Sequence, residues 1–245
     1  MKKIFFVLVF FAAAFIVRSQ TQFFPSVKVE FEKTVNVRAQ YKDLDLQWYE
    51  MIKDRIPSTV ISYYDFIGDS SKSLFKPGRE VSIDPRTWYR AVADKNVVYT
   101  DFTKGTTISQ KPVFEETFLV EDSVLKIKWK ITPDIRNIAG YDCRKAIGLL
   151  NDSITVFAFY TEEIMISGGP EGIHGLPGMI LGVGIPRLHS TWFATKVEVI
   201  NINMKTVVPA TKGKKVNRET MVNALDKVLK QWGTYGSKLI VNFLI

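Results

Sequence analysis

The stretch VKVEFEKTVNV, residues Val27–Val37, has the pattern on which the fold prediction depends. Apart from Lys33, every odd position holds valine or phenylalanine, whereas the even positions hold lysine, glutamate, threonine or asparagine. Side chains of a β-strand point alternately to its two faces, so a period of two indicates one buried and one solvated face. We therefore predict a strand over residues 27–37.

Further strands follow from the same reasoning. Residues 125–131 alternate between apolar side chains and lysines, and the turn Glu-Asp-Ser separates them from Val113–Val120, which predicts a hairpin. A second hairpin is expected where Asn-Asp-Ser joins Cys143–Leu150 to Ile154–Tyr160. Shorter strands are predicted near Tyr63–Phe66, Val97–Phe102 and Thr191–Ile202.

Two segments have helical patterns. Residues 216–233 place Asn217 at the N-cap, repeat apolar residues at helical spacing and put Gly233 at the C-terminal end. Residues 42–57 contain a weaker apolar stripe and end at Pro57. The sequence therefore predicts a single α+β domain, mainly β, in which a curved antiparallel sheet is joined by a C-terminal amphipathic helix.

The stretch GGPEGIHGLPGMILGVGIP, residues 168–186, holds seven of the fifteen glycines of the chain. Each glycine costs about 0.5 to 1 kcal/mol in ordering entropy relative to alanine. Flexible linkers lack large apolar side chains, whereas this stretch contains seven isoleucine, leucine, methionine or valine residues. We therefore predict a packed loop whose glycines adopt positive φ or allow close backbone contact. Its spacing matches neither a phosphate loop nor a dinucleotide fingerprint.

The segment Gly175–Ile180 reads GLPGMI, and GYDCRKA (residues 140–146), FAFYTEEI (157–164), GGP (168–170) and ATKVEV (194–199) accompany it. In this combination the chain resembles the GLPGLI family of exported bacterial envelope proteins over residues 60–200. The resemblance implies a half-barrel-like sheet similar to that of periplasmic lipoprotein carriers, and it implies no settled activity. Met179 and Gly182 depart from the leucine and glutamate that the family pattern has there.

The N-terminus has the features of an export signal. Two lysines precede the apolar run from Ile4 to Val17, and Ser19 follows it, as in a secretory signal peptide cleaved after that residue. The run is shorter than the roughly 20 residues that span a bilayer. We therefore expect a signal peptide over residues 1–19, a single GLPGLI-type domain over residues 20–245, and a periplasmic or outer-membrane-associated location.

The charge and the partners of the mature chain follow from this boundary. Without the leader, 30 basic and 25 acidic side chains would remain, which is a modest excess. Because export separates the protein from the genome, we expect no nucleic-acid partner, and we expect no transmembrane segment in the mature chain.

Candidate chemical groups are few. Cys143 is the single cysteine and the histidines are His174 and His189. An envelope hydrolase or metal-binding protein using these three residues is the alternative hypothesis, although no C-x-x-C or H-x-x-x-H spacing supports a metal site. Adjacent carboxylates such as Glu162 and Glu163 point to opposite faces of a strand, which disfavours an acid/base pair. We expect no metal, no cofactor and no catalytic residue.

The leading hypothesis is a non-catalytic envelope protein that binds an apolar or amphipathic ligand or an outer-membrane protein partner. The many aromatic residues could line the concave side of the sheet, although an ordinary core would use them equally well. Gly175 and Gly178 are assigned a structural role in the predicted packed loop. The residues expected at the binding surface are Tyr141, Ile173, Leu176, Pro177, Met179 and Trp192.

Overall fold

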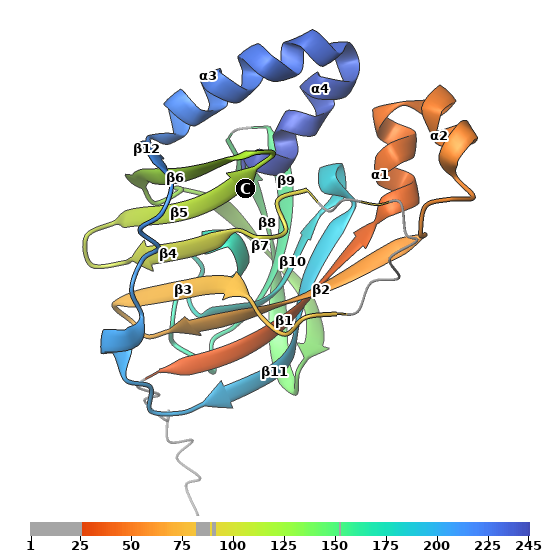
Figure 1. The fold of residues 1–245 in the computed structure, drawn as a ribbon. Helices are drawn as coiled ribbons and strands as arrows, with labels where there is room; N and C mark the ends of the chain where they lie inside the picture. Colours follow the sequence, from red (N-terminus) through yellow and green to blue (C-terminus); the bar gives the residue numbers. More distant parts are fainter. Residues whose placement is uncertain (1–25, 82–88, 90–91, 152) are drawn as a thin grey trace, which may run out of the picture.

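The structure is a computed structural model that describes residues 26–81, 89, 92–151 and 153–245. The predicted signal peptide lies outside the described residues. One sheet of twelve strands runs through the molecule in the order β12-β6-β5-β4-β3-β2-β1-β11-β10-β9-β8-β7 (Figure 1). All neighbouring strands pair antiparallel except β12 and β6, which are parallel. The predicted fold class, a mainly β domain with a curved antiparallel sheet and a C-terminal helix, is confirmed.

The strands are β1 (Val27–Asn36), β2 (Thr59–Gly68), β3 (Lys72–Pro77), β4 (Val97–Asp101), β5 (Thr106–Val113), β6 (Glu116–Ser123), β7 (Lys128–Ile138), β8 (Tyr141–Leu150), β9 (Ile154–Thr161), β10 (Met179–Ile185), β11 (Ser190–Val199) and β12 (Lys214–Val216). The α-helices are α1 (Val37–Leu44), α2 (Leu46–Ile52), α3 (Arg218–Leu229) and α4 (Gly233–Leu239). Short 3-10 helices are η1 (Pro170–Gly172), η2 (Pro186–Leu188), η3 (Met204–Thr206), η4 (Lys230–Trp232) and η5 (Ile240–Phe243).

Strand pairing confirms one predicted hairpin and corrects the other. β8 and β9 pair with Leu150 opposite Ile154, as predicted. The hairpin predicted between residues 113–120 and 125–131 is wrong, because β6 pairs with β5 whereas β7 pairs with β8 at the far edge of the sheet. The alternating pattern reports which face of a strand is buried, but it does not report the partner strand.

The helices differ from the prediction mainly at their ends. α3 begins after Asn217, whose side chain accepts a hydrogen bond from the backbone N of Thr220 at 2.8 Å, as predicted. At Gly233, with φ 62°, the chain turns and continues into α4. The single helix predicted over residues 42–57 is instead α1 and α2, because Asp45 caps α2 by accepting from the backbone N of Trp48 at 3.0 Å.

The glycine stretch is packed, as its apolar side chains predict. All but one of the β10 residues are buried, and the main core also includes Ile173 and Leu176. Gly172, Gly175 and Gly178 have positive φ. The last residues of the chain lie within the curve of the sheet (Figure 1), where Val241 and Ile245 join the same core.

Candidate functional site

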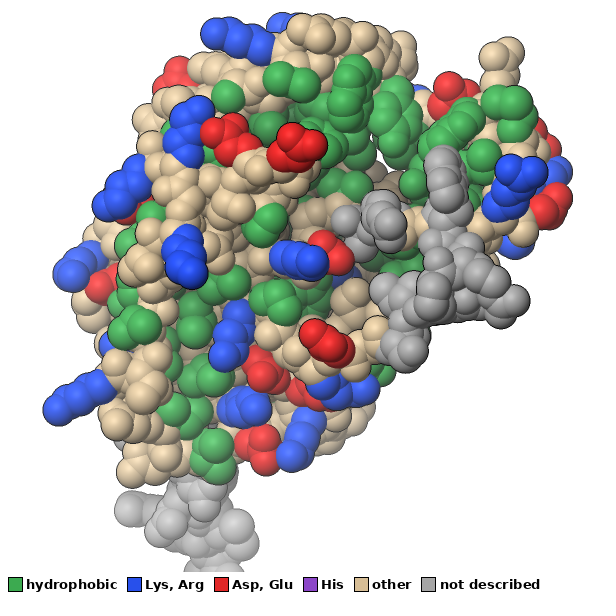
Figure 2. Space-filling view, viewed as in Figure 1, with side chains coloured by type: hydrophobic (Ala, Val, Ile, Leu, Met, Phe, Trp, Pro, Cys, Tyr) green, Lys and Arg blue, Asp and Glu red, His purple; other side chains and the backbone are tan. Residues whose placement is uncertain are grey.

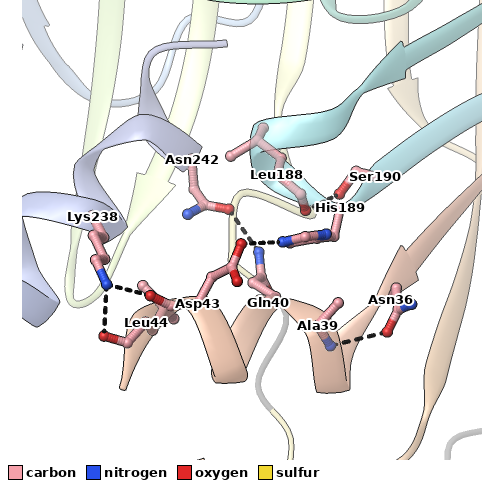
Figure 3. A network of polar contacts seen from close by, with 10 residues as sticks. All are labelled: Asn36, Ala39, Gln40, Asp43, Leu44, Leu188, His189, Ser190, Lys238 and Asn242. Carbon is pink, nitrogen blue, oxygen red and sulfur yellow. Dashed lines mark hydrogen bonds and ion pairs between the residues drawn. The ribbon is translucent and has the colours of Figure 1, made fainter. Parts of the chain in front are cut away.

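An open cleft of about 420 Å³ lies where α1, the η2 segment and the α4–η5 segment meet. Six of its seven lining residues have polar side chains, and the lining comes from three distant parts of the chain (Figure 3). The lining residues are Gln40, Asp43, Leu44, Arg187, His189, Lys238 and Asn242. A second open space of similar volume beside the β6–β7 connection is lined by both polar and apolar residues, and of these two spaces only the first joins a histidine to a carboxylate.

The η2 segment holds His189 at the mouth of this cleft. His189 has left-handed backbone, with φ 48°, which is uncommon for a residue other than glycine. Its backbone N donates to Pro186 O, and its backbone O accepts from Asn36 N, each at 2.9 Å. The ring Nε2 lies 2.7 Å from Oδ2 of Asp43. The turn therefore presents the imidazole to α1, and such backbone strain is frequent at functional sites.

Four further hydrogen bonds order the side chains where α4 and η5 meet α1. Gln40 Nε2 donates to Asn242 Oδ1 at 3.1 Å, and Asn242 Nδ2 donates to Leu239 O at 3.0 Å, so both amides have defined orientations. Lys238 Nζ donates to the carbonyl oxygens of Asp43 and Leu44 at the end of α1. A cation at this position complements the unpaired carbonyls of a helix C-terminus. These bonds tie α4 and η5 to α1.

The cleft can form several hydrogen bonds with a polar ligand. The side chain of Asp43 is 69% exposed and that of His189 is 26% exposed, so their hydrogen-bonded pair can be reached from solvent. Arg187 is exposed and, within the described part of the chain, has no hydrogen bond or ion pair. Its guanidinium is a donor array suited to carboxylate or hydroxyl oxygens.

The structure places most of the predicted binding residues in the interior. Ile173, Leu176, Met179 and Trp192 are at most 3% exposed and belong to the main core. Tyr141 is partly exposed and packs against that core, and Pro177 is exposed. None of the six lines the cleft. A contact between these residues and a ligand stays a prediction.

The three residues of the enzyme alternative lie in separate environments. The thiol of Cys143 is buried, and burial raises its pKa to about 12, with smaller contributions from Glu163 and Asp142. His174 Nδ1 contacts Gly172 O at 3.1 Å, whereas His189 contacts Asp43. Among the described residues, no group of three or more His, Cys, Asp or Glu could hold a metal ion. A thiol held in its neutral form is a poor nucleophile.

A buried polar cluster lies behind the cleft, inside the curve of the sheet. It comprises Lys33 on β1, Asn96, Lys111 on β5, Glu171 in η1 and Trp192 on β11, all at most 7% exposed. Asn96 Nδ2 donates to Glu171 Oε2 at 3.1 Å, and the Lys33 Nζ lies 4.9 Å from the centre of the Trp192 ring. Sequence reasoning missed this cluster, although Lys33 was the one exception to the alternation of its strand.

Burial lowers the pKa of two lysines in this cluster, Lys33 and Lys111. It lowers the pKa of Lys33 and lowers the pKa of Lys111 to about 8, while the negative charge of Glu171 opposes both changes. Lys111 Nζ also donates to the carbonyl oxygens of Ile245 and Phe243. Two buried lysines therefore lie within electrostatic range of one buried carboxylate, which is an arrangement of high electrostatic cost.

The lowered pKa of Lys111 predicts an unusual pH dependence of stability. Between about pH 8 and pH 10, an unfolded lysine with a pKa near 10.4 binds more protons than the folded one, so the free energy of unfolding should rise with pH. The contribution approaches about 1.4 kcal/mol per pH unit. Urea unfolding from pH 8 to pH 9.5 measures it. Lys111→Met should reduce the rise in the free energy of unfolding with pH, whereas Lys128→Met, at an exposed site, is the control and should leave it unchanged. If both variants show the same pH dependence, Lys111 is not its source.

The fold and the cleft together define a class of protein: a curved-sheet domain with a polar cleft where its helices meet. The family model described as "N-glycanase peptide, N-terminal domain" (PNGase F-II) matches residues 93–227, which is more than half of the chain. The chain therefore belongs to this family. The matched residues include Arg187 and His189, whereas Gln40, Asp43, Lys238 and Asn242 lie outside the match.

Two solved structures of PNGF-II have a similar fold. One, in space group P21, superposes with a TM-score of 0.53 at 14% sequence identity and covers 86% of this chain and 34% of that chain. The other, in space group C2, gives a TM-score of 0.52 at 14% identity and covers 85% and 33%. The chain thus spans about a third of the length of these proteins. A search of curated proteins finds no significant match.

Proposed function

We propose that this domain is a non-catalytic binding module that holds a carbohydrate in the cleft between α1, η2 and α4–η5. The observation that carries the proposal is the convergence of the hydrogen-bonded groups of Gln40, Asp43, His189 and Asn242 on one open space of about 420 Å³. Sugar hydroxyl and amide groups require such a mixture of oriented donors and acceptors. Membership of a family named after an N-glycanase supports a glycan as the ligand.

The interior favours this polar ligand over an apolar guest. The two cavities beside the buried cluster have volumes of only about 30 and 20 Å³. Residues 243–245 line the larger one, and Ile245 lines the smaller one. Ligand pockets for small molecules have volumes of roughly 300 Å³ or more. The cleft meets this requirement, whereas the concave interior is filled by core side chains. An amphipathic ligand or an outer-membrane partner would therefore have to bind on the outside of the sheet.

The cellular setting belongs to the proposal as well. The leader-like residues 1–19 and the resemblance to the GLPGLI family support export to the periplasm or the outer membrane. Within the described part of the chain, no helix is long and apolar enough to cross a membrane. A hydrolase using Cys143 is disfavoured because burial raises the pKa of its thiol and because His174 and His189 have other hydrogen-bond partners.

Binding of a soluble N-glycopeptide, followed by isothermal titration calorimetry, tests the proposed function. The double variant Gln40→Ala/Arg187→Ala removes one amide and one guanidinium from the cleft. If each lost hydrogen bond contributes about 1 kcal/mol, the dissociation constant should increase at least about tenfold. Lys205→Ala, an exposed basic site in η3, is the matched control and should bind as the unmodified protein does.

Two results would count against the proposed function. One is the absence of any heat of binding for the unmodified protein at millimolar glycopeptide. The other is unchanged affinity in the double variant, which would place the glycan elsewhere on the molecule. Thermal unfolding of each variant would show that any lost affinity comes from the cleft and not from a loss of the fold.

A further inference from the structure

Phe114 and Trp232 form an exposed aromatic pair on the outside of the domain. Phe114 is the first residue of the two-residue turn between β5 and β6, and Trp232 ends η4. Their side chains are 58% and 44% exposed, and their ring centres lie 5.3 Å apart at an interplanar angle of 64°. Adjacent exposed aromatic rings form an apolar patch of the kind that ligands or partner molecules bind.

The backbone at Phe114 adds a second cost. Its φ is 54°, in the left-handed region that hairpin turns usually give to glycine, asparagine or aspartate. For a residue with a side chain this conformation is strained, because Cβ comes close to the following carbonyl oxygen. The strained turn therefore places the Phe114 ring at the surface, between Trp232 and the buried Phe243. Such outliers are frequently found at functional sites.

The pair is held firmly in place. Phe114 also contacts the buried Phe243, with ring centres 5.8 Å apart, and Gly233, with φ 62°, turns the chain directly after Trp232. A surface that is already ordered loses little conformational entropy when it binds a ligand.

Three half-buried aromatic residues connect this pair to α1. Ring centres lie 6.4 Å apart for Trp232 and Tyr235, 6.1 Å for Tyr235 and Trp48, and 5.2 Å for Trp48 and Tyr41. Figure 2 shows hydrophobic side chains gathered over α4 and over α1 and α2, with a hollow between them. We call these five residues, Phe114, Trp232, Tyr235, Trp48 and Tyr41, the aromatic row.

The aromatic row and the cleft meet at the contact between α1 and α4. Tyr41 follows Gln40 in α1, and Tyr235 lies one helical turn before Lys238 in α4. Lys238 itself donates to the last carbonyls of α1, which holds the two helices together at this point. None of the five row residues lines the cleft, but Tyr41 and Tyr235 lie on the same two helices as cleft residues, so one ligand long enough to leave the cleft would reach the row.

We propose that the aromatic row is a stacking surface for additional sugar rings, so that the ligand of this domain is an oligosaccharide and not a single sugar. This inference rests on the proposed function, because the cleft would bind one end of the same ligand. Pyranose rings have apolar C–H faces and polar edges, so they can lie flat on aromatic rings while their hydroxyl groups stay in water. Successive stacking sites increase affinity with ligand length.

Binding of N-acetylglucosamine and of its linear tetramer, measured by isothermal titration calorimetry, tests the row. The unmodified protein should bind the tetramer at least tenfold more tightly than the monomer. Phe114→Gly and Trp232→Ala should lose most of this difference while retaining affinity for the monomer. Phe114→Gly also removes the backbone strain, so its thermal unfolding temperature should change little. Ile135→Ala, which replaces a 67% exposed residue on β7, is the control and should behave as the unmodified protein does.

The experiment distinguishes an error in the row proposal from an error in the cleft proposal. If the unmodified protein binds the tetramer no better than the monomer, or if both row variants retain the full difference, the row proposal is wrong and the cleft proposal stands. If neither saccharide binds, both proposals fail. A membrane surface is the other outcome that would overturn the proposal. In that case the unmodified protein would bind phosphatidylglycerol vesicles, and both row variants would lose this binding without any change in tetramer affinity.

Discussion

Replacing Gly178 with valine should prevent the domain from folding. A Cβ atom built at this position would lie 2.0 Å from the backbone O of Thr161, and φ is +147°, a conformation that side-chain-bearing residues rarely adopt. Neither β9 nor β10 can move aside, because Met179 pairs with Thr161 between two buried strands. We expect a loss of more than about 4 kcal/mol, which is exceptional for one substitution.

Two related glycines provide the comparison for this experiment. Gly175 has φ +95°, but its nearest neighbour would be the Trp129 ring at 3.5 Å, so Gly175→Val should cost only about 1 to 3 kcal/mol of backbone strain. At Gly184 the nearest atom would be 3.8 Å away, and Gly184→Ala should be well tolerated. Soluble expression and urea unfolding measure all three. If Gly178→Val unfolds cooperatively, with a free energy of unfolding within about 1 kcal/mol of that of the unmodified protein, the close contact between Gly178 and Thr161 described here is wrong.

Replacing Trp192 with alanine should produce the second large loss of stability. The side chain is 2% exposed and is the largest fully buried one among the described residues, in the main core on β11. Removal of such a ring typically costs about 3 to 5 kcal/mol, because apolar contacts are lost and a cavity remains. Here the loss also removes the ring that lies 4.9 Å from the buried ammonium of Lys33.

Trp192→Phe separates ring packing from the indole N–H. Within the described residues, Nε1 of Trp192 has no hydrogen-bond partner, so phenylalanine forfeits no observed bond. It should cost clearly less than alanine, and neither change should weaken binding of the N-glycopeptide once the protein is folded. Urea unfolding and calorimetry provide the two measurements. A folded Trp192→Ala protein with normal stability and lost glycopeptide binding would move Trp192 from the core to a binding surface.

Local patterns predicted much of this fold. The alternation over residues 27–37 corresponds to β1, Asn-Asp-Ser joins β8 to β9, and the cap at Asn217 begins α3. The apolar residues of the glycine stretch correctly indicated that it is packed. These features depend on residues close together in the chain, whose backbone preferences and burial pattern are visible without knowledge of the rest of the molecule.

The candidate site could not be predicted in the same way. The cleft joins α1, η2 and the α4–η5 segment, which lie far apart along the chain, and the Gln40–Asn242 hydrogen bond spans 202 positions. Likewise, Val113–Val120 and residues 125–131 are adjacent in sequence but belong to β-pairs at opposite sides of the sheet. Periodicity encodes which face of an element is buried, whereas the partner of that face is selected by the packing of the whole chain. Strand order, the buried Lys33–Glu171–Lys111 cluster and the cleft therefore arise from long-range packing, because each depends on contacts that no local segment contains.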